Sequence, residues 1–269
     1  MAVTLGPGQS GQIWILDLNQ RSRPLKLTSQ GHNVFPTWTR DGKRVVFRSV
    51  RATGIGLLSI AADGTEAQPT EIDLQLIDAD RGQLFPHDFT ADGQLLFSSA
   101  KAGTRQDLML ASIEQPVPTI VPWLATEAAE NGARFSPDGR YLAYVSDSTG
   151  TPEVWIRSFP GPGAPARVSE TGGREPLWSP DGRELFFQSG PAIMAVTVRM
   201  GEAGIEISKP MQLFSGGFAP FQTTVPRSYD VLPDGGFVMI QLEGDDIRET
   251  IAVKLNWFEE LSRRVPLRD

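Results

Sequence analysis

One pattern of hydrophobic and polar positions recurs five times along the chain. Its clearest copy is Arg134–Asp147 (RFSPDGRYLAYVSD), in which an arm with an aromatic side chain is followed by Pro-Asp-Gly and an apolar run. An Asp-Gly pair tolerates positive φ, so the two arms can fold back on each other as a β-hairpin. The five copies carry turn aspartates at Asp41, Asp92, Asp138, Asp181 and Asp234.

The spacing of these hairpins predicts a β-propeller. The turn aspartates lie 43–53 residues apart, which is the period of a propeller blade. A large apolar side chain stands three residues before each aspartate, at Trp38, Phe89, Phe135, Trp178 and Val231. The second arms are continuous apolar runs, which is typical of strands covered on both faces. These arms are Val45–Phe47, Leu95–Phe97, Leu142–Val145, Leu185–Phe187 and Phe237–Ile240.

We therefore expect an all-β chain that forms a β-propeller of four-stranded antiparallel blades. Gln12–Leu18 and Pro24–Thr28 are interpreted as the third and fourth strands of a first blade whose hairpin is missing. This gives a six-bladed plan with an incomplete first blade, preceded by a loose lead over residues 1–10. The alternative is a five-bladed closed ring, in which Gln12–Thr28 completes the blade begun by Tyr229–Gln241.

The chain shows no linker that would divide it, so residues 1–269 are expected to form a single propeller domain. Residues 257–269 are expected to be a C-terminal tail with one or two helical turns. An incomplete ring leaves open strand edges, so two copies could also pair as a dimer.

Composition narrows the classes of partner. The net charge is −7, from 25 basic and 32 acidic residues, which argues against binding to nucleic acid or anionic lipid. There is no cysteine, so neither a disulfide nor thiol chemistry is expected. The first ten residues lack the apolar core of a signal peptide. No apolar run approaches the ~20 residues of a transmembrane helix, so this chain is not expected to insert into a membrane.

The signatures SPDGRYLAYVSD and SPDGRELFF resemble those of TolB-like, WD-type β-propellers. The segments QIWILDL, GHNVFPTWTRDGKRVVF, GGREPLWSPDGRELFF and LNWFEELSRRVP also resemble the C-terminal propeller of bacterial membrane-anchored serine/threonine protein kinases. That resemblance implies an extracytoplasmic, periplasmic sensor domain that binds a protein. The chain carries no kinase signature, so kinase activity is not expected of it.

Polar residues gather in the segments that lead into the innermost strands, which line one mouth of a propeller channel. We interpret them as a pocket for a protein, a peptide or a small ligand. The alternative is that they cap strand ends and bond loop backbone. The predicted ligand-binding residues are His32, Asn33, His87, Asp88, Glu130, Asn131, Arg174, Glu175 and Arg227.

A calcium site is a sharper version of this prediction. Asn33, Asp88, Asn131 and Glu175 are hard oxygen donors, one from each of four blades. Calcium-dependent lactonase-type propellers are similar in outline. Because the offsets of these residues from the turn aspartates vary, their convergence on one ion does not follow from the sequence. No other cofactor is expected.

We favour a non-enzymatic binding or sensor propeller, and we assign no catalytic residue. The chain lacks a G-x-S-x-G motif and a cysteine, so a nucleophile is not evident. Two alternatives remain open. One is a calcium-dependent lactonase- or esterase-like hydrolase that uses the channel, and the other is the gating propeller of a serine peptidase.

Overall fold

The structure, a computed structural model, consists of β-strands joined by turns and loops. It describes residues 1–6, 9–18, 22–74, 84–100, 105–114, 118–161, 163–201, 204–216, 227–243 and 248–254. These residues contain no helix, and hence none long and apolar enough to cross a membrane. The prediction of an all-β chain is confirmed. The predicted tail, 257–269, lies outside the described residues.

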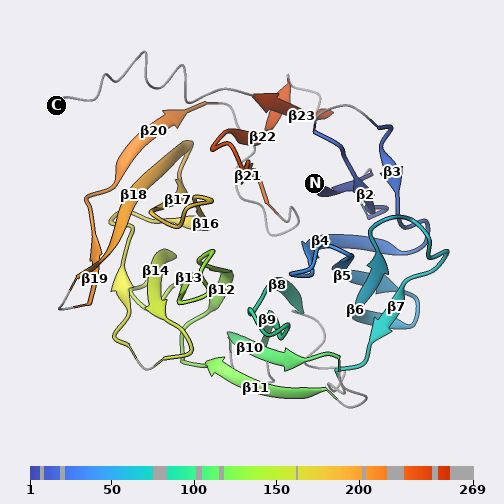
Figure 1. Ribbon diagram of the computed structural model, residues 1–269, viewed down its shortest axis with the longest axis horizontal. Coiled ribbons are helices and arrows are strands. Elements are labelled where there is room, and N and C mark those ends of the chain that lie inside the picture. Colours follow the sequence, from blue (N-terminus) through green and yellow to red (C-terminus); the bar gives the residue numbers. More distant parts are fainter. Residues whose placement is uncertain are drawn as a thin grey trace. The chain divides into compact units, whose positions relative to one another are not determined.

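Across these described ranges the strands fall into six sheets, each built from neighbours in the chain (Figure 1). The first sheet consists of β1 (Ala2–Leu5), β2 (Gln12–Ile15) and β3 (Leu25–Lys26), and the second of β4 (His32–Trp38), β5 (Arg44–Arg51), β6 (Gly54–Ala61) and β7 (Thr70–Ile72). The third sheet consists of β8 (Phe85–Phe89), β9 (Leu95–Ala100), β10 (Gln106–Ser112) and β11 (Thr119–Leu124). The fourth consists of β12 (Glu130–Phe135), β13 (Tyr141–Ser146), β14 (Glu153–Ser158) and β15 (Ala166–Arg167). The last two sheets are β16 (Arg174–Trp178), β17 (Glu184–Ser189), β18 (Ala192–Gly201), β19 (Gly204–Ile207) and β20 (Met211–Ser215); and β21 (Tyr229–Val231), β22 (Phe237–Glu243) and β23 (Arg248–Lys254).

Contacts between residues divide the chain into two compact units. Unit 1 comprises residues 1–133 with 146–148, and unit 2 comprises residues 134–145 with 149–269. The prediction that the whole chain is one domain stays a prediction, as does the number of blades.

The second strands of the hairpins bury both of their faces, as the apolar runs predicted. In unit 1, Val45 and Phe47 of β5 pack with β2 and β6, whereas Val46 between them packs with β8, β9 and β10. In unit 2, Leu185 and Phe187 of β17 pack with β13 and β14, and Phe186 packs with β21 and β22. Because alternate side chains of a strand point to opposite faces, β5 and β17 each join two neighbouring cores.

The turn aspartates stabilise their own hairpins. The Asp181 carboxylate accepts hydrogen bonds from the Ser179 hydroxyl at 2.6 Å and from the Arg183 amide at 3.1 Å, and these bonds lower the pKa of Asp181. Burial opposes ionisation of Asp138, but hydrogen bonds from Ser136 and Arg140 outweigh it and lower the pKa of Asp138 to about 2. These contacts give the turn aspartates a structural role within their own hairpins.

The start of the chain differs from the prediction. We expected a loose lead, but Ala2–Leu5 forms β1 and pairs antiparallel with β2, with Thr4 opposite Ile13. The first sheet is thus three-stranded, with one more strand than the sequence indicated. The fourth repeat also contains one strand more than predicted. The first part of β18 pairs with β20, and its last residues pair with the additional strand β19.

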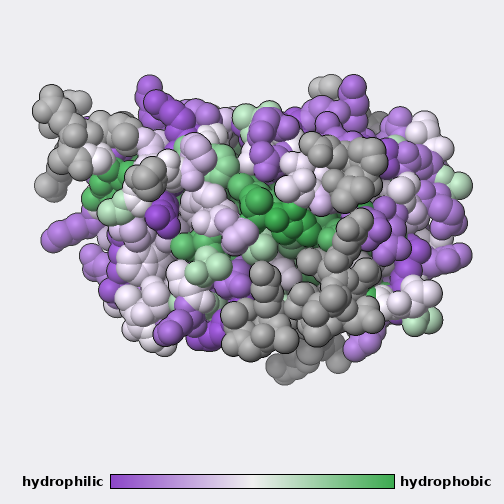
Figure 2. All heavy atoms as spheres, turned by 90° about the horizontal axis from the view of Figure 1, so that it is seen from below, coloured by the Kyte–Doolittle hydropathy of each residue, from purple (hydrophilic) through white to green (hydrophobic). Residues whose placement is uncertain are grey.

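Strand β11 is an exposed edge of its sheet, since it pairs only with β10 among the described strands. Figure 2 shows hydrophobic side chains gathering on this side of the molecule, between hydrophilic ones. Val121 of β11 is 45% exposed. Pro122 has no N–H to offer along this edge, and a proline in an edge strand disfavours pairing with a further strand.

Candidate functional site

The predicted ligand-binding residues belong to strands more than to loops. His32 and Asn33 begin β4, Glu130 and Asn131 begin β12, and Arg174 and Glu175 begin β16; His87 and Asp88 lie within β8, and Arg227 lies two residues before β21. The expectation that they lie on segments before the strands was therefore wrong for eight of the nine. We call the starting halves of β4, β8, β12, β16 and β21 the leading segments. Six of the nine residues belong to unit 1 and three to unit 2.

A left-handed residue recurs in the leading segments, six positions before the turn aspartate. Phe35, Gly132 and Glu175 have φ values of 60°, 59° and 53°. In β4 and β16 this residue precedes a proline and lies where the register with the next strand shifts. A left-handed non-glycine residue costs about 1–3 kcal/mol. The position accepts Gly132 in β12, so the backbone does not require a glutamate at 175.

Glu175 is a buried carboxyl that its neighbours satisfy only in part. Its Oε2 accepts hydrogen bonds from the Ser228 amide at 2.9 Å and the Ser228 hydroxyl at 2.8 Å, and its backbone carbonyl accepts one from the Tyr229 hydroxyl at 2.7 Å. Its Oε1 is buried and has no hydrogen-bond partner among the described residues. Burial raises the pKa of Glu175, against the opposing effects of Ser228, Arg227 and Arg134.

Glu130 in unit 1 has the same character. Its side chain is buried, its Oε1 accepts a hydrogen bond from the Thr126 hydroxyl, and its Oε2 has no hydrogen-bond partner in the described part of the chain. Burial raises the pKa of Glu130, and the charges of Asp107 and Asp147 raise it further. Asp147 is itself held by Arg105, at 2.6 Å between Nη2 and Oδ2.

Asn33 and His32 mainly connect the first two sheets of unit 1. The Asn33 Nδ2 donates to Gln12 Oε1 and Thr28 Oγ1, each at 3.1 Å, while its fully buried Oδ1 has no partner in the described ranges. His32 Nδ1 accepts a hydrogen bond from the Gly11 amide at 3.1 Å. Burial, with a smaller effect of Arg48, lowers the pKa of His32, so the neutral imidazole is favoured.

The other predicted residues make local contacts. Asp88 Oδ1 accepts a hydrogen bond from the Phe89 amide at 2.8 Å, and Asn131 Nδ2 donates to Gln106 Oε1 at 3.0 Å. His87 is buried, and its backbone carbonyl accepts a hydrogen bond from the Thr37 hydroxyl at 3.0 Å. Arg174 is half-buried in β16. Arg227 pairs with Asp230 at 3.5 Å.

No group of three or more His, Cys, Asp and Glu side chains within the described ranges is arranged to hold a metal ion. The predicted calcium ligands Asn33, Asp88 and Asn131 belong to unit 1, whereas Glu175 belongs to unit 2. Two of the four side chains are carboxylates, and Asp88 already accepts a backbone hydrogen bond. The calcium site stays a prediction.

Sequence reasoning missed an aromatic and basic cluster in unit 1. The Phe35 and Phe85 rings pack edge to face with centroids 4.8 Å apart, and the Arg48 guanidinium lies over the Phe85 ring at 5.3 Å. Burial lowers the pKa of Arg48. The repeated Phe-Pro dipeptide, at 35–36 and 85–86, was a signal for the two rings. Arg48 belongs to β5, and no pattern in the sequence indicates that its guanidinium lies over the Phe85 ring.

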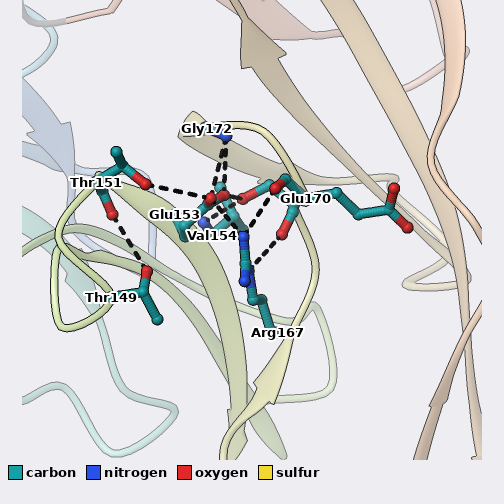
Figure 3. A network of polar contacts seen from close by, with 8 residues as sticks. Thr149, Thr151, Glu153, Val154, Arg167, Glu170 and Gly172 are labelled. Carbon is teal, nitrogen blue, oxygen red and sulfur yellow. Dashed lines mark hydrogen bonds and ion pairs between the residues drawn. The ribbon is translucent and has the colours of Figure 1, made fainter.

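The buried carboxylate of Glu153, unlike those of Glu130 and Glu175, accepts hydrogen bonds on both of its oxygens. Glu153, at the start of β14, accepts hydrogen bonds from Ser169 Oγ, from Arg167 Nη2 at 2.6 Å and from the Gly172 amide at 3.1 Å (Figure 3). The Ser169 oxygen in turn accepts the Val154 amide at 2.8 Å. This network links the start of β14 to β15 and to the loop that follows β15, so its role is structural.

Comparisons with known proteins agree on the fold. No family model matches the chain. The uncharacterized peptidase YuxL of Bacillus subtilis is 38% identical over 85 residues, which cover 30% of this chain and 11% of that protein. TolB from Acinetobacter baumannii superposes with a TM-score of 0.66 and 20% identity over 94% of this chain and 60% of that chain. A puromycin-hydrolyzing peptidase from Mycobacterium tuberculosis gives a TM-score of 0.61 and 18% identity over 93% of this chain and 42% of that chain.

These similarities show that the chain has the β-propeller fold of TolB-like proteins and of peptidase propellers. The chain spans 60% or less of the length of the three proteins. The resemblance to kinase-associated propellers stays a prediction.

Proposed function

We propose that this propeller is a binding module. Buried acceptor oxygens on its leading segments recognise a peptide or protein partner that supplies the hydrogen-bond donors. One observation supports this most directly. Three residues lie at or next to the start of the first strand of a hairpin, and each has one buried oxygen without a donor among the described residues. They are Asn33, Glu130 and Glu175. All three oxygens are acceptors, so a complementary ligand is rich in N–H groups.

Of these three residues, Glu175 combines an unfilled buried oxygen with a left-handed backbone. A buried carboxylate with an unfilled oxygen loses about 1–3 kcal/mol relative to a satisfied one. Its left-handed backbone adds a further cost, although a glycine occupies the same position in β12. Such costs concentrate at binding sites, where a ligand supplies the missing partner. A peptide amino terminus, a lysine or an arginine would supply a charged donor to Oε1.

A hexapeptide library with free amino termini, offered to the purified protein in fluorescence polarisation, tests this proposal. We expect the preferred sequences to present a lysine, an arginine or a free amino terminus, and acetylated copies to bind less tightly when the amino terminus is the determinant. Glu175→Gln removes one charge-assisted hydrogen bond, worth about 1.5–3 kcal/mol, so the affinity should fall by roughly 10- to 150-fold.

Glu206→Gln in β19 is a matched control, because Glu206 is exposed and belongs to the same unit. Its affinity should stay within twofold of the native value. Thermal unfolding of both variants verifies that they fold. Equal affinities of the native protein and the Glu175→Gln variant would contradict the proposed role of Glu175.

A second candidate is the propeller of a serine peptidase, which selects substrates for a separate catalytic domain. The 38% identity with an uncharacterized peptidase favours it. A native chain that continues beyond residue 269 into a segment labelled by a fluorophosphonate would support this candidate. An extracytoplasmic location and a dimer formed through incomplete blades remain further proposals, which fractionation and sedimentation of the native protein would test.

A further inference from the structure

A hollow of about 290 Å³ lies in unit 2 at the ends of three first strands, away from the leading segments. We call it the turn hollow. Much of its lining comes from the ends of β12, β16 and β21 and from the prolines of the turns that follow, namely Phe135, Trp178, Val231, Pro137, Pro180 and Pro233. Its volume lies at the lower end of the range for ligand sites, which suits one side chain of a partner.

The three prolines are not required by the turns in which they stand. The corresponding positions in the two repeats of unit 1 hold Arg40 and Ala91, within the same kind of Asp-Gly turn. All three prolines are exposed, so they present rigid apolar rings to solvent beside the hollow.

The inner wall of the hollow is held in place before any ligand binds. The Trp178 indole N–H donates to the Arg134 carbonyl at 3.1 Å, and the buried Phe135 ring packs edge to face on Phe159 with centroids 4.7 Å apart. The charge of Arg134 acts on Glu175 in the leading segments, so we assign its side chain no role in the hollow. A site whose side chains are already fixed loses little conformational entropy on binding.

The turn aspartate of the β21–β22 hairpin lacks two polar neighbours that the other four hairpins share. In those four, a hydroxyl two residues before the aspartate donates to its carboxylate, and a long polar side chain stands two residues after it. The four pairs are Thr39 and Lys43, Thr90 and Gln94, Ser136 and Arg140, and Ser179 and Arg183. Leu232 and Gly236 take these places beside Asp234, so neither neighbour can donate a side-chain hydrogen bond to it.

Asp138 shows what the two neighbours supply. Its carboxylate accepts hydrogen bonds from the Ser136 hydroxyl at 2.6 Å and from Arg140 Nε at 2.7 Å. Asp234 is exposed, and within the described ranges its carboxylate accepts only the Gly236 amide, at 3.0 Å. Asp234 therefore retains acceptor positions for a donor from a partner.

The position and charge of Asp234 indicate the class of occupant. Asp234 directly follows Pro233, which lines the hollow, and consecutive Cα atoms are about 3.8 Å apart. In the other two turns around the hollow the aspartate is paired with its own arginine, at 2.7 and 3.8 Å, so Asp234 adds a negative charge that no turn arginine matches. An arginine covers apolar surface with its stem while its planar guanidinium pairs with a carboxylate. An arginine side chain is thus complementary both to the apolar hollow and to the charge beside it.

We propose that the turn hollow binds an arginine side chain of a peptide or protein partner. The arginine stem packs against Trp178 and the prolines, and its guanidinium donates to the Asp234 carboxylate. The partner thereby supplies from outside the contact that Arg140 makes to Asp138 within its own turn. This site is separate from the leading segments and does not rest on the proposed function of Glu175.

Two fluorescein-labelled hexapeptides, blocked at both ends and built from serine and glycine around one central residue, test the proposal by fluorescence polarisation. The central residue is arginine in one and citrulline, its uncharged analogue, in the other. We expect the arginine peptide to bind more tightly by roughly two- to fivefold, the range for an exposed ion pair. Asp234→Asn should bind both peptides equally. Gly236→Arg should weaken binding of the arginine peptide, because a guanidinium of the chain then pairs with Asp234.

Pro180→Ala tests the apolar part of the site, since Ala91 stands at the same position in a unit 1 turn. It should weaken binding of both peptides. The exposed control Glu206→Gln should keep the native affinities, and so should Glu175→Gln, which alters the leading segments only. Thermal unfolding of each variant separates these outcomes from a failure to fold.

No binding of the arginine peptide at millimolar protein, or equal binding of the two peptides by the native protein, would overturn the proposal. An arginine preference that persists in both Asp234→Asn and Gly236→Arg would overturn the role of Asp234. A preference lost in Glu175→Gln but kept in Asp234→Asn would assign the arginine to the leading segments instead. Unchanged binding by Pro180→Ala would overturn the hollow as the place of the arginine stem.

Discussion

Replacing Glu153 by alanine is expected to destabilise unit 2 by about 3–5 kcal/mol. The Glu153 side chain is 1% exposed, whereas its partner Arg167 is 40% exposed. The carboxylate accepts hydrogen bonds from Arg167, Ser169 and Gly172, as Figure 3 shows. Alanine removes all of these acceptors at once and leaves no side chain long enough to replace them.

The magnitude depends on which donors can return to water. The Arg167 guanidinium is partly exposed and can be rehydrated. The Ser169 hydroxyl is buried, and the Gly172 amide faces the carboxylate from the loop after β15. A buried donor without an acceptor costs about 1–3 kcal/mol, and two such donors are consistent with the expected total. At about 2–4 °C per kcal/mol, the melting temperature should fall by roughly 6–20 °C.

Differential scanning calorimetry at pH 7 measures this fall. Glu153→Gln should lie between the native protein and Glu153→Ala, because Gln12 at the corresponding place in β2 accepts the Thr28 hydroxyl at 2.8 Å. Glu206→Ala, an exposed control in the same unit, should change the stability by less than about 0.5 kcal/mol. A fall of less than about 3 °C for Glu153→Ala would refute the reasoning.

Further predictions follow from the buried acids and the turns. Because the pKa of Glu130 is raised above its ordinary 4.5, the folded state keeps a proton that the unfolded state releases, so this group's stabilisation is lost as pH rises from about 4.5 through the raised value. Glu130→Gln should remove that slope from the unfolding free energy measured between pH 4 and 8, and an unchanged slope would contradict it. Gly182→Ala and Gly42→Ala should each cost about 1–2 kcal/mol in urea unfolding, since both have left-handed φ values of 71° and 67°. The cost should be larger at Gly182, where a Cβ would lie 3.3 Å from the Pro137 ring, than at Gly42, where it would meet nothing within 4 Å, and the reverse order would contradict this reasoning.

The hairpins could be predicted from the sequence because their determinants are local. A turn aspartate such as Asp181 is bonded within its own five residues, and the apolar run of β17 is visible as Leu185–Phe187. Strand β1 could not be predicted in this way. Its four residues follow no turn signal, and their pairing with β2 is what makes Ala2–Leu5 a strand.

The candidate site was predictable by position but not by environment. The repeated hairpin located His32, Glu130 and Glu175 near the starts of first strands, although their offsets from the turn aspartates differ. Whether the polar side chain of each residue finds hydrogen-bond partners depends on residues far away in the chain. Ser228, which binds Glu175, lies 53 residues from it, and no local pattern identifies that contact.

Buried polar side chains at the strand starts of these repeats differ in how their oxygens are hydrogen-bonded. Gln12 and Glu153 begin equivalent strands and are each bonded to a hydroxyl whose oxygen also accepts the next backbone amide. Glu130 and Glu175 begin first strands, and each has an oxygen without a partner among the described residues. A residue selected only for folding is expected to be satisfied within the chain, because an unfilled buried oxygen costs stability. An unfilled buried oxygen near the start of two first strands is what the proposed binding role predicts, because a partner would supply the missing donor.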